Sequence, residues 1–351
     1  MTSVRATFKM ILKNLHFKSR ILYNIFMIVN GYSYKNIKKA ANFLKKGEPI
    51  AFPTETVYGL GANIYNKKSV AKIFEIKQRP FFDPLIVHIA NLKQLEEIAK
   101  TEDERIYLLA KHFWPGPLTL ILPKQKRISY LITAGLETVA IRMPSNIIAL
   151  SLIQELDSPI AAPSANLFTH LSPTTAQHVL KQLGNKIKLI LDGGKTTCGV
   201  ESTILSIEKN KKPVVLRMGG LPIENIEKII GKIINPTKKS QKVLAPGNLK
   251  NHYAPQKPLI IINNEKEIPK YLKNNKQKIG YLAFQKINNK KILSDYKILS
   301  SQGDFKEAAS NFFDYLHQLD DGPAEIILAE KIKEVNLGKA MMERLIKAAH
   351  R

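Results

Sequence analysis

The sequence of 351 residues has a single cysteine, Cys198. One cysteine excludes both an internal disulfide framework and a zinc site built on CxxC pairs, and it favours a reducing compartment, the cytoplasm. Long apolar runs are also missing. No window reaches about 18 uninterrupted apolar residues, so we expect no membrane span and no membrane partner. The composition, 44% apolar and 24% charged, is that of a globular protein, and the length predicts two domains.

Acidic residues are scarce. The chain has 54 Lys and Arg against 29 Asp and Glu, a net charge of +25, and residues 1–47 hold ten basic residues and no acidic one. A basic surface suits polyanions such as nucleic acid or nucleotide phosphates. Lys, Asn and Ile are abundant along the whole chain, however, so a general bias in composition explains most of the excess. Aromatic residues make up only 8%, which argues against a surface that stacks RNA bases.

Residues 1–30 are interpreted as an N-terminal extension, for which three explanations stay open. The stretch is basic, partly apolar and free of acidic residues, as in an organelle transit peptide. A start codon assigned too early, with Met27 as the true first residue, explains it better. A helical or disordered extension is the third explanation. We expect residues 1–26 to be dispensable.

Residues 31–231 alternate between helical and strand patterns and predict one mixed α/β domain. Strands are expected at 49–52, 85–89, 118–122, 139–143, 159–162, 188–191, 202–207 and 213–217, and helices at 36–46, 69–79, 92–100, 103–112, 147–156, 174–183 and 223–230. Some successive strands have no helix between them, which indicates antiparallel pairs. The fold class is α/β, with a mixed twisted sheet and helices.

Residues 232–256 interrupt this pattern with prolines, glycine and lysines, and predict a linker. Strand and helix alternate again over residues 257–351. Strands are expected at 258–262, 279–284 and 324–329, and helices near 267–274 and at 304–319 and 338–349. This pattern predicts a smaller, mostly parallel, three-layer α/β domain, which has neither a GxGxxG nor a Walker loop.

Several short motifs carry polar residues at the ends of these elements. PTETVYGLG, residues 53–61, combines hydroxyls, a carboxylate and two glycines, which suits a polar ligand, although a plain strand-exit turn has the same composition. KQRP, residues 77–80, puts two cations close together, which suits a phosphate, although basic residues are common at helix C-termini. His88 lies in an apolar strand, where a histidine is more often a core residue than a ligand.

Further along the chain, residues 163–166 (PSAN) and Ser172 can form a cradle for phosphate or ribose. The remaining motifs are DGG at 192–194, GVEST at 199–203, RMGG at 217–220, and PG with HYAP in the linker. Each motif alone is weak. Their order along one chain is specific.

In this order the motifs resemble those of the threonylcarbamoyl-AMP synthase family, in its long form with a YrdC-like catalytic domain and an extra C-terminal domain. The matching segments are PTETVYGLG, KQRPFFDPLIVHI, PGPLTLIL, VAIRMP, APSAN, SPT, DGGKTTCGVEST, VLRMGG and APGNLKNHYAP. The resemblance implies a YrdC-like mixed sheet, followed by a smaller Rossmann-like three-layer domain.

The resemblance also implies a reaction. A member of this family is an L-threonylcarbamoyladenylate synthase, a nucleotidyltransferase. Threonine and bicarbonate form a carbamate, which attacks the α-phosphate of ATP and gives threonylcarbamoyl-AMP and pyrophosphate for tRNA modification. The nucleophile is made on the substrate, so the protein needs cations and amides that stabilise charge at phosphorus rather than a nucleophilic side chain.

Site residues follow from matching the motifs position by position. The candidate catalytic residues are Lys77 and Arg79. The ATP-binding set is Lys77, Arg79, Asp83, Thr138, Ser164, Asn166, Ser172, Arg217 and Tyr253. The threonine-binding set is Thr56, His88, Arg142, Ala162 and Ser202, and in it Arg142 suits the amino-acid carboxylate.

Cofactors and partners follow in the same way. We expect Mg²⁺ with ATP, no organic cofactor and no metal held by the protein alone. The product passes to a downstream tRNA threonylcarbamoyl transferase, and direct tRNA contact is not required. Asp83 departs from the family, which usually has Asn there, and Gln78 replaces the usual Gly. An aspartate beside a triphosphate repels it unless magnesium lies between them.

Two other classes compete with this one. An RNA-binding YrdC-like module without catalysis fits the basic charge. A carbamoyl transferase of the hydrogenase-maturation type also contains a YrdC-like domain, but its cysteine-rich zinc modules are excluded by the single cysteine. The linker is long for a passive connection, so we expect it to cover the active site through Tyr253. The alternative is that Tyr253 packs between the domains.

Overall fold

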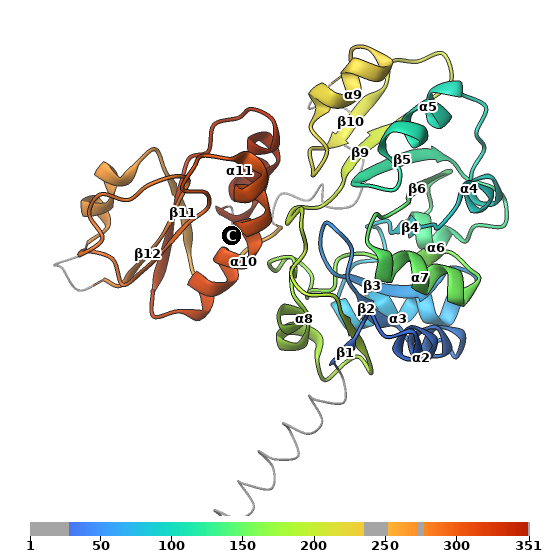
Figure 1. Ribbon diagram of the computed structural model, residues 1–351, viewed down its shortest axis with the longest axis horizontal. Coiled ribbons are helices and arrows are strands. Elements are labelled where there is room, and N and C mark those ends of the chain that lie inside the picture. Colours follow the sequence, from blue (N-terminus) through green and yellow to red (C-terminus); the bar gives the residue numbers. More distant parts are fainter. Residues whose placement is uncertain (1–27, 235–251, 273–276, 350–351) are drawn as a thin grey trace, which may run out of the picture.

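The computed structural model describes residues 28–234, 252–272 and 277–349, which form two α/β domains side by side (Figure 1). Most of the expected N-terminal extension and residues 235–251 of the expected linker lie outside the described residues. No helix in these three ranges combines the length and the apolar character needed to cross a bilayer.

The first domain contains the strands β1 (Ile28–Asn30), β2 (Ile50–Phe52), β3 (Gly59–Asn63), β4 (Ile86–His88), β5 (Leu118–Pro123), β6 (Thr138–Arg142), β7 (Ile160–Ala161), β8 (Ile190–Asp192), β9 (Thr203–Ser206) and β10 (Val214–Arg217). Its helices are α2 (Tyr34–Lys45), α3 (Lys67–Lys77), α4 (Leu92–Ile98), α5 (Glu104–Phe113), α6 (Tyr130–Thr133), α7 (Ile147–Leu156), α8 (Ala176–Leu183) and α9 (Ile223–Ile230). In the described part of the chain the strands form a ten-stranded sheet in the order β1-β8-β2-β3-β7-β4-β6-β5-β9-β10.

The sheet is mixed, as the sequence predicts. Strands that follow one another without a helix, such as β2 and β3 or β9 and β10, are antiparallel, whereas β4 and β6 are parallel. Helices α2 and α7 cover one face with a compact apolar cluster. Helices α3, α4, α5, α8 and α9 contribute to the larger cluster on the other face.

Helix α2 illustrates how the local sequence sets these faces. Ile37, Ala40, Ala41 and Leu44 repeat at helical spacing and are all buried, while the lysines between them face solvent. The helix ends before Gly47, whose φ of +78° is a left-handed conformation that glycine adopts without strain. The predicted helix and its glycine stop are therefore confirmed.

Strand β3 was not predicted. Its glycines were interpreted as part of a strand-exit loop, but Gly61 lies inside the sheet. A Cβ at Gly61 would lie 2.7 Å from both Phe52 and Ile160, so this glycine is needed for packing rather than for a ligand. Ile28–Asn30, expected to belong to the extension, form β1 and pair with β8.

The second domain contains β11 (Leu259–Ile262), η2 (a 3₁₀ helix, Glu265–Tyr271), β12 (Ile279–Ala283), β13 (Asp295–Ile298), α10 (Phe305–Asp321), β14 (Ile326–Glu330) and α11 (Leu337–Ala349). The sheet is parallel, in the order β11-β14-β12-β13. Helices α10 and α11 cover one face, and η2 with the segment after β12 covers the other, so the small parallel α/β domain is confirmed. Strand β13 was not predicted.

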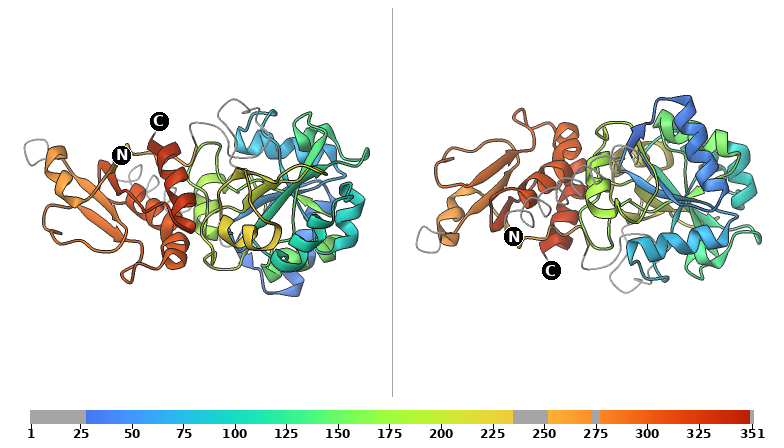
Figure 2. Two further views of the ribbon diagram at one scale, coloured as in Figure 1. Left: turned by 90° about the horizontal axis from the view of Figure 1, so that it is seen from above. Right: turned by 90° about the horizontal axis from the view of Figure 1, so that it is seen from below.

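The two domains share a buried interface. Both views in Figure 2 place α10 and α11 between the second sheet and the first domain. One apolar cluster joins Val57, Leu171 and Val200 of the first domain to Phe312 and Phe313 of α10. The contact is therefore built like a domain core.

Two stacked histidines also lie in this interface. The rings of His178 on α8 and His317 on α10 are 3.9 Å apart between centroids, and Nε2 of His317 lies 3.1 Å from the carbonyl oxygen of Ser172. Burial lowers the pKa of His178 to about 4 and that of His317 to about 3. Around His178, Asp314 opposes this shift, whereas Lys181 and Lys195 add to it.

We expect the domain interface to weaken in mild acid. The pKa of each histidine is lower in the folded chain than in the unfolded one, so the unfolded chain binds more protons below about pH 6.5 and stability falls as the pH drops toward 4. The free energy of unfolding, measured in urea, should be lower at pH 5 than at pH 7.5 by about 1–2 kcal/mol for each histidine. His178→Gln should shrink that difference, and His112→Gln, at an exposed site, should leave it unchanged. An equal pH effect in both variants would contradict this assignment.

Candidate active site

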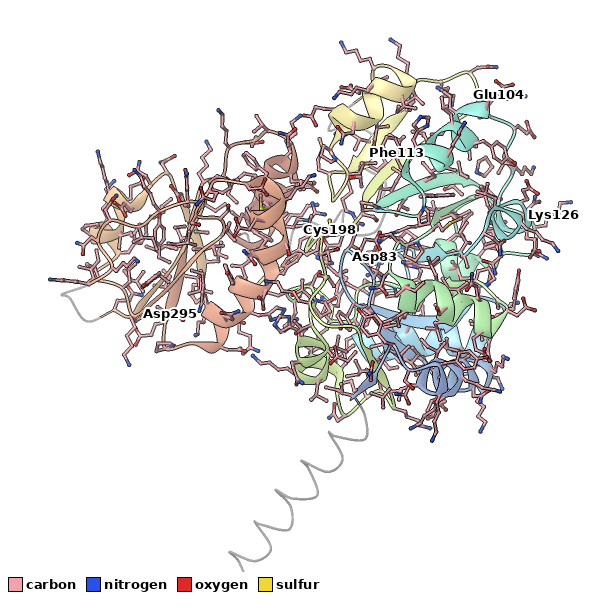
Figure 3. The ribbon with its side chains drawn as sticks, viewed as in Figure 1. Asp83, Glu104, Phe113, Lys126, Cys198 and Asp295 are labelled. Carbon is pink, nitrogen blue, oxygen red and sulfur yellow. The ribbon has the colours of Figure 1, made fainter. Side chains whose placement is uncertain are left out.

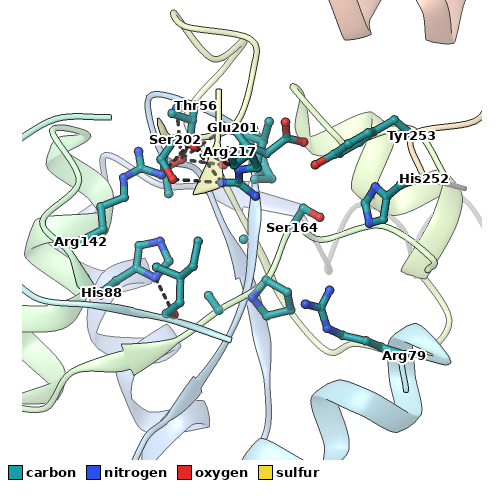
Figure 4. A pocket seen from close by; sticks show the side chains of 17 residues that line it. Thr56, Arg79, His88, Arg142, Ser164, Glu201, Ser202, Arg217, His252 and Tyr253 are labelled. Carbon is teal, nitrogen blue, oxygen red and sulfur yellow. Dashed lines mark hydrogen bonds between the residues drawn. The ribbon is translucent and has the colours of Figure 1, made fainter. Parts of the chain in front are cut away.

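A cavity of about 50 Å³ lies at the edge of the first sheet, on the side of the second domain (Figure 4). All five residues predicted to hold threonine line it, together with four of the predicted ATP set. These nine are Thr56, His88, Arg142, Ala162, Ser202, Arg79, Ser164, Arg217 and Tyr253. The sequence motifs therefore converge in space.

The sheet topology explains this convergence. Strands β4 and β6 are parallel neighbours, and their last residues, His88 and Arg142, are register partners. Strand β10 is antiparallel to β9, so Arg217 at its end lies beside Ser202, which immediately precedes β9. Ser164 follows β7 and bridges to Gly59 at the start of β3.

Arg142 is the charged centre of one end of the cavity. Its Nη2 lies 2.6 Å from Oε1 of Glu55, and its Nη1 donates a hydrogen bond of 2.8 Å to Oγ1 of Thr56. The arginine side chain is only 4% exposed. A buried guanidinium with one carboxylate partner retains donors for a second anion, such as a carboxylate.

His88 is neutral at this end. Burial, followed by the nearby Arg142, lowers its pKa to about 3. Its Nδ1 lies 3.2 Å from the carbonyl oxygen of Ile86, and its ring meets Phe52 edge-on at 6.0 Å. A neutral imidazole in this position can exchange a hydrogen bond with a polar ligand without adding charge.

Ser202 and Arg217 form a second polar pair. Nη2 of Arg217 donates to Oγ of Ser202 at 3.1 Å and to its carbonyl oxygen at 2.9 Å. The Ser202 hydroxyl is also 2.7 Å from the Thr119 hydroxyl. These contacts fix the serine at the cavity wall.

Arg79 lies at the opposite end, as Figure 4 shows. Its Nη2 is 2.8 Å from Oδ1 of Asp83 and donates to the carbonyl oxygen of Pro84 at 2.9 Å, and its Nε donates to the carbonyl oxygen of Asp83 at 3.2 Å. These three contacts leave Nη1 without a partner among the described residues. Contacts with Asp83 and Pro84 thus fix the arginine, which lines the cavity.

Lys77 does not line the cavity. Its Nζ donates to the carbonyl oxygens of Ser164 at 2.6 Å and Asn166 at 2.5 Å, and the side chain is fully buried. Burial, followed by the Arg79 charge, lowers its pKa well below the usual value. In this structure Lys77 fixes the turn that carries Ser164.

Four other residues predicted to bind ATP are also not among those that line the cavity. Asp83 is fully buried behind Arg79. Asn166 uses its amide to donate to the carbonyl oxygens of Leu167 and His170, and so stabilises a turn. Ser172 donates to Oε1 of Glu201 at 2.5 Å.

Thr138 lies at the far end of a strand that reaches the cavity. It begins β6, and Arg142 ends the same strand. Four residues of extended chain separate them by about 13 Å. A residue matched by motif alone can therefore lie far from the cavity that its strand helps to form.

His252 and Tyr253 line the cavity next to each other. Their ring centroids are 4.0 Å apart, and Tyr253 also packs at 5.7 Å against Phe313 of α10. Burial, followed by the nearby Arg79, lowers the pKa of His252 well below its usual value, so the ring is neutral. Tyr253 thus lines the cavity and packs between the domains, and its role as a cover of the active site stays a prediction.

Two carboxylates were missed in the sequence. Glu55 pairs with Arg142, and Glu201, which lines the cavity, pairs with Arg344 of α11 at 2.9 Å. Each stands inside a motif, beside Thr56 or Ser202, and that adjacency was the available signal. Arg344 had no comparable signal, because it occupies an ordinary position in an amphipathic helix.

Cys198 lies where the two domains meet (Figure 3). Burial raises the pKa of its thiol to about 11, so it stays protonated and is a poor nucleophile. Among the described residues, no three His, Cys, Asp or Glu side chains are grouped so that they could hold a metal ion. The arginines and hydroxyl groups of the cavity wall suit anion binding and positioning.

Comparison with known proteins gives consistent results. A family model described as "Telomere recombination" matches residues 42–219, and one described as "Threonylcarbamoyl-AMP synthase, C-terminal domain" matches residues 221–350. The threonylcarbamoyl-AMP synthase of Pyrococcus abyssi is 44% identical over 326 residues, 89% of this chain and 94% of that protein. That of Bacillus subtilis is 44% identical over 321 residues, 89% and 92% of the two chains.

Among solved structures, the crystal structure of P. abyssi Sua5 complexed with L-threonine superposes with a TM-score of 0.84. The two sequences are 42% identical, and the match covers 92% of this chain and 97% of the other. Both domains, as well as their arrangement, are therefore shared.

Proposed function

This chain belongs to the threonylcarbamoyl-AMP synthase family in its two-domain form, and from that premise we propose that the cavity binds L-threonine at the Arg142 end and ATP at the Arg79 end. Enzymes of this family are nucleotidyltransferases of tRNA processing. The observation that carries the proposal is the pair of buried arginines at opposite ends of one cavity, with Ser164 between them (Figure 4).

The Arg142 end has the groups that an amino acid with a hydroxyl side chain needs. Arg142 supplies a charged donor for the carboxylate, and His88 and Ser202 supply neutral hydrogen-bonding groups. Glu55 balances the charge of Arg142, so this end stays close to neutral when it binds a zwitterion, whose ammonium group offsets its carboxylate. These features favour a small zwitterion over a second phosphate.

The Arg79 end has the groups that a nucleotide needs. Nη1 of Arg79 is available to a phosphate oxygen, and Ser164 offers a hydroxyl on the cavity wall. We propose that the carbamate formed from threonine and bicarbonate attacks the α-phosphate between the two ends, and that Arg79 and Arg217 stabilise the charge that develops there. Lys77 supports this end indirectly, by holding the backbone of Ser164.

Magnesium enters this proposal with the substrate. We propose that Asp83 is not a ligand of this magnesium, because its carboxylate is turned toward Arg79 and does not line the cavity. Mg²⁺ is commonly held by substrate phosphates with few protein ligands. We therefore propose that ATP binds as its magnesium complex, and that Asp83 fixes and neutralises Arg79.

The cavity must open for this reaction. About 50 Å³ is too small for ATP, since pockets for ligands of that size typically measure about 300–1,000 Å³. His252 and Tyr253 line the cavity, so we propose that they cover its nucleotide end, move aside to admit ATP and return to exclude water from the mixed anhydride product. The product then passes to a tRNA threonylcarbamoyl transferase, and we place both steps in the cytoplasm.

We expect pyrophosphate release from ATP to require both L-threonine and bicarbonate, because the carbamate has to form before the α-phosphate is attacked. The measurement uses purified chain, γ-labelled ATP, whose label leaves in pyrophosphate, Mg²⁺ and bicarbonate, with and without threonine and with no RNA present. Serine is the matched control, since it lacks only the γ-methyl group and should turn over more slowly. Equal pyrophosphate release without threonine would overturn the proposed function.

A further inference from the structure

Arg344 reaches the active site from the second domain. It lies on α11 with its side chain 1% exposed, and its Nε is 2.9 Å from Oε2 of Glu201, a residue 143 positions earlier. Its Nη1 donates to the carbonyl oxygen of Met218 at 2.6 Å. Arg344 thus joins a charged side chain of the second domain to Glu201, a charged residue of the cavity wall.

Glu201 needs this partner because of where it lies. Glu201 lines the cavity, and Figure 4 shows it between Arg142 and Tyr253, near where two anions, the carbamate and the α-phosphate of ATP, would meet. An uncompensated carboxylate there would repel both. Burial tends to raise the pKa of Glu201, but Arg344 and then Arg217 outweigh it and keep the pKa below its usual value, so the group is ionised.

Two arginines thus share one carboxylate. Arg217 holds the hydroxyl and carbonyl oxygens of Ser202 at the cavity wall. Arg344 binds Glu201 from the side of the second domain, and Ser172 donates to the other carboxylate oxygen. Arg217 is the second cation that lowers the pKa of Glu201, so without Arg344 that attraction would draw Arg217 away from Ser202.

Arg344 also contacts Tyr253, the proposed cover of the cavity. Its guanidinium lies 5.4 Å from the ring centroid of Tyr253, within the range of a cation–π interaction. Tyr253 has a φ of +65°, a conformation that a residue with a side chain adopts only when its surroundings hold it. Phe313 of α10 and Arg344 of α11 supply those surroundings.

We propose that Arg344 is a positioning residue of the active site: it neutralises Glu201, leaves Arg217 on Ser202 and holds Tyr253 over the nucleotide end. The second domain is then part of the catalytic apparatus rather than an appended module. This inference rests on the proposed function, because it assumes that anions react beside Glu201.

The test compares variants of the full chain in the threonine-dependent pyrophosphate assay. Arg344→Met should raise KM for ATP at least tenfold and lower kcat at least tenfold. Arg344→Lys keeps the charge and should recover much of the KM for ATP. The double variant Arg344→Met with Glu201→Gln no longer has the unpaired Glu201 carboxylate. Its KM for ATP should be within about threefold of that of Glu201→Gln alone.

The matched control is Lys339→Met. Lys339 lies on the same helix and forms an ion pair across the same interface, 2.6 Å from Glu224, but outside the cavity. This variant should keep wild-type kinetics. Thermal unfolding of every variant reports whether the chain is folded.

Wild-type turnover reports on the proposed function, and the differences between variants report on Arg344. If the wild-type chain shows no threonine-dependent turnover, the function is wrong. If the wild type is active and Arg344→Met behaves like Lys339→Met, the positioning role is wrong. It is also wrong if Glu201→Gln gives no rescue and the loss of activity simply follows the loss of thermal stability, because a purely structural contact predicts that pattern.

Discussion

Replacing Arg79 by alanine should lower threonine-dependent pyrophosphate release by about two to three orders of magnitude. Arg79 presents Nη1 to the nucleotide end of the cavity, and losing one charge-assisted contact in the transition state costs about 3–4 kcal/mol. The substitution also leaves Asp83 as a buried carboxylate without its partner, which destabilises the fold. The single variant therefore mixes two effects.

A second pair of variants separates them. Asp83→Asn keeps the shape of the side chain and removes its charge, and it should retain most activity because Asp83 does not line the cavity. The double variant Arg79→Ala with Asp83→Asn should have a melting temperature close to that of Asp83→Asn. Its activity should be as low as that of Arg79→Ala. Near-wild-type kcat/KM in this double variant would show that the phosphate site lies elsewhere.

The strands that end at the site could be predicted from the sequence. The apolar runs that finish at His88 and near Arg142 predict buried strands, and polar residues directly after such strands meet at one edge of a sheet. The structure adds the reason for their contact, which is that β4 and β6 are parallel neighbours. That pairing depends on the whole sheet order and is not encoded in either strand.

Other features could not be predicted because they depend on long-range packing. Lys77 looks like a phosphate ligand beside Arg79, yet its direction is set by the carbonyl oxygens of Ser164 and Asn166, almost 90 residues later. The ion pair of Glu201 with Arg344 joins a loop to a helix of the other domain. An arginine in an amphipathic helix gives no sign in the sequence that it is buried.

The two glycines of PTETVYGLG have different roles, and the sequence predicted only one of them. Gly59 lines the cavity, as expected for close approach to a ligand. Gly61, two residues later, makes room for Phe52 and Ile160 inside the sheet. One motif therefore serves both the site and the core, and its composition does not separate the two roles.

Replacing Arg142 by methionine should raise KM for threonine by two to three orders of magnitude and leave the affinity for ATP nearly unchanged. Arg142 lines this end of the cavity, and a charge-assisted contact to a carboxylate in a buried site is worth about 2–5 kcal/mol. Methionine preserves the length and the apolar stem of the side chain, so the change mainly removes charge.

This experiment needs a control for Glu55, the ion-pair partner of Arg142. Arg142→Met strands the Glu55 carboxylate, whose Oε1 lies 2.6 Å from the guanidinium in the wild-type chain, and its charge would repel the threonine carboxylate. The double variant with Glu55→Gln removes that repulsion and tests the loss of the arginine alone. Its KM for threonine should stay at least a hundredfold above that of Glu55→Gln. Titration with a non-hydrolysable ATP analogue should give Kd values within about threefold of the wild type, because Arg79 at the other end is untouched. If the double variant instead binds threonine normally and loses the nucleotide, the two ends of the cavity have been assigned the wrong way round.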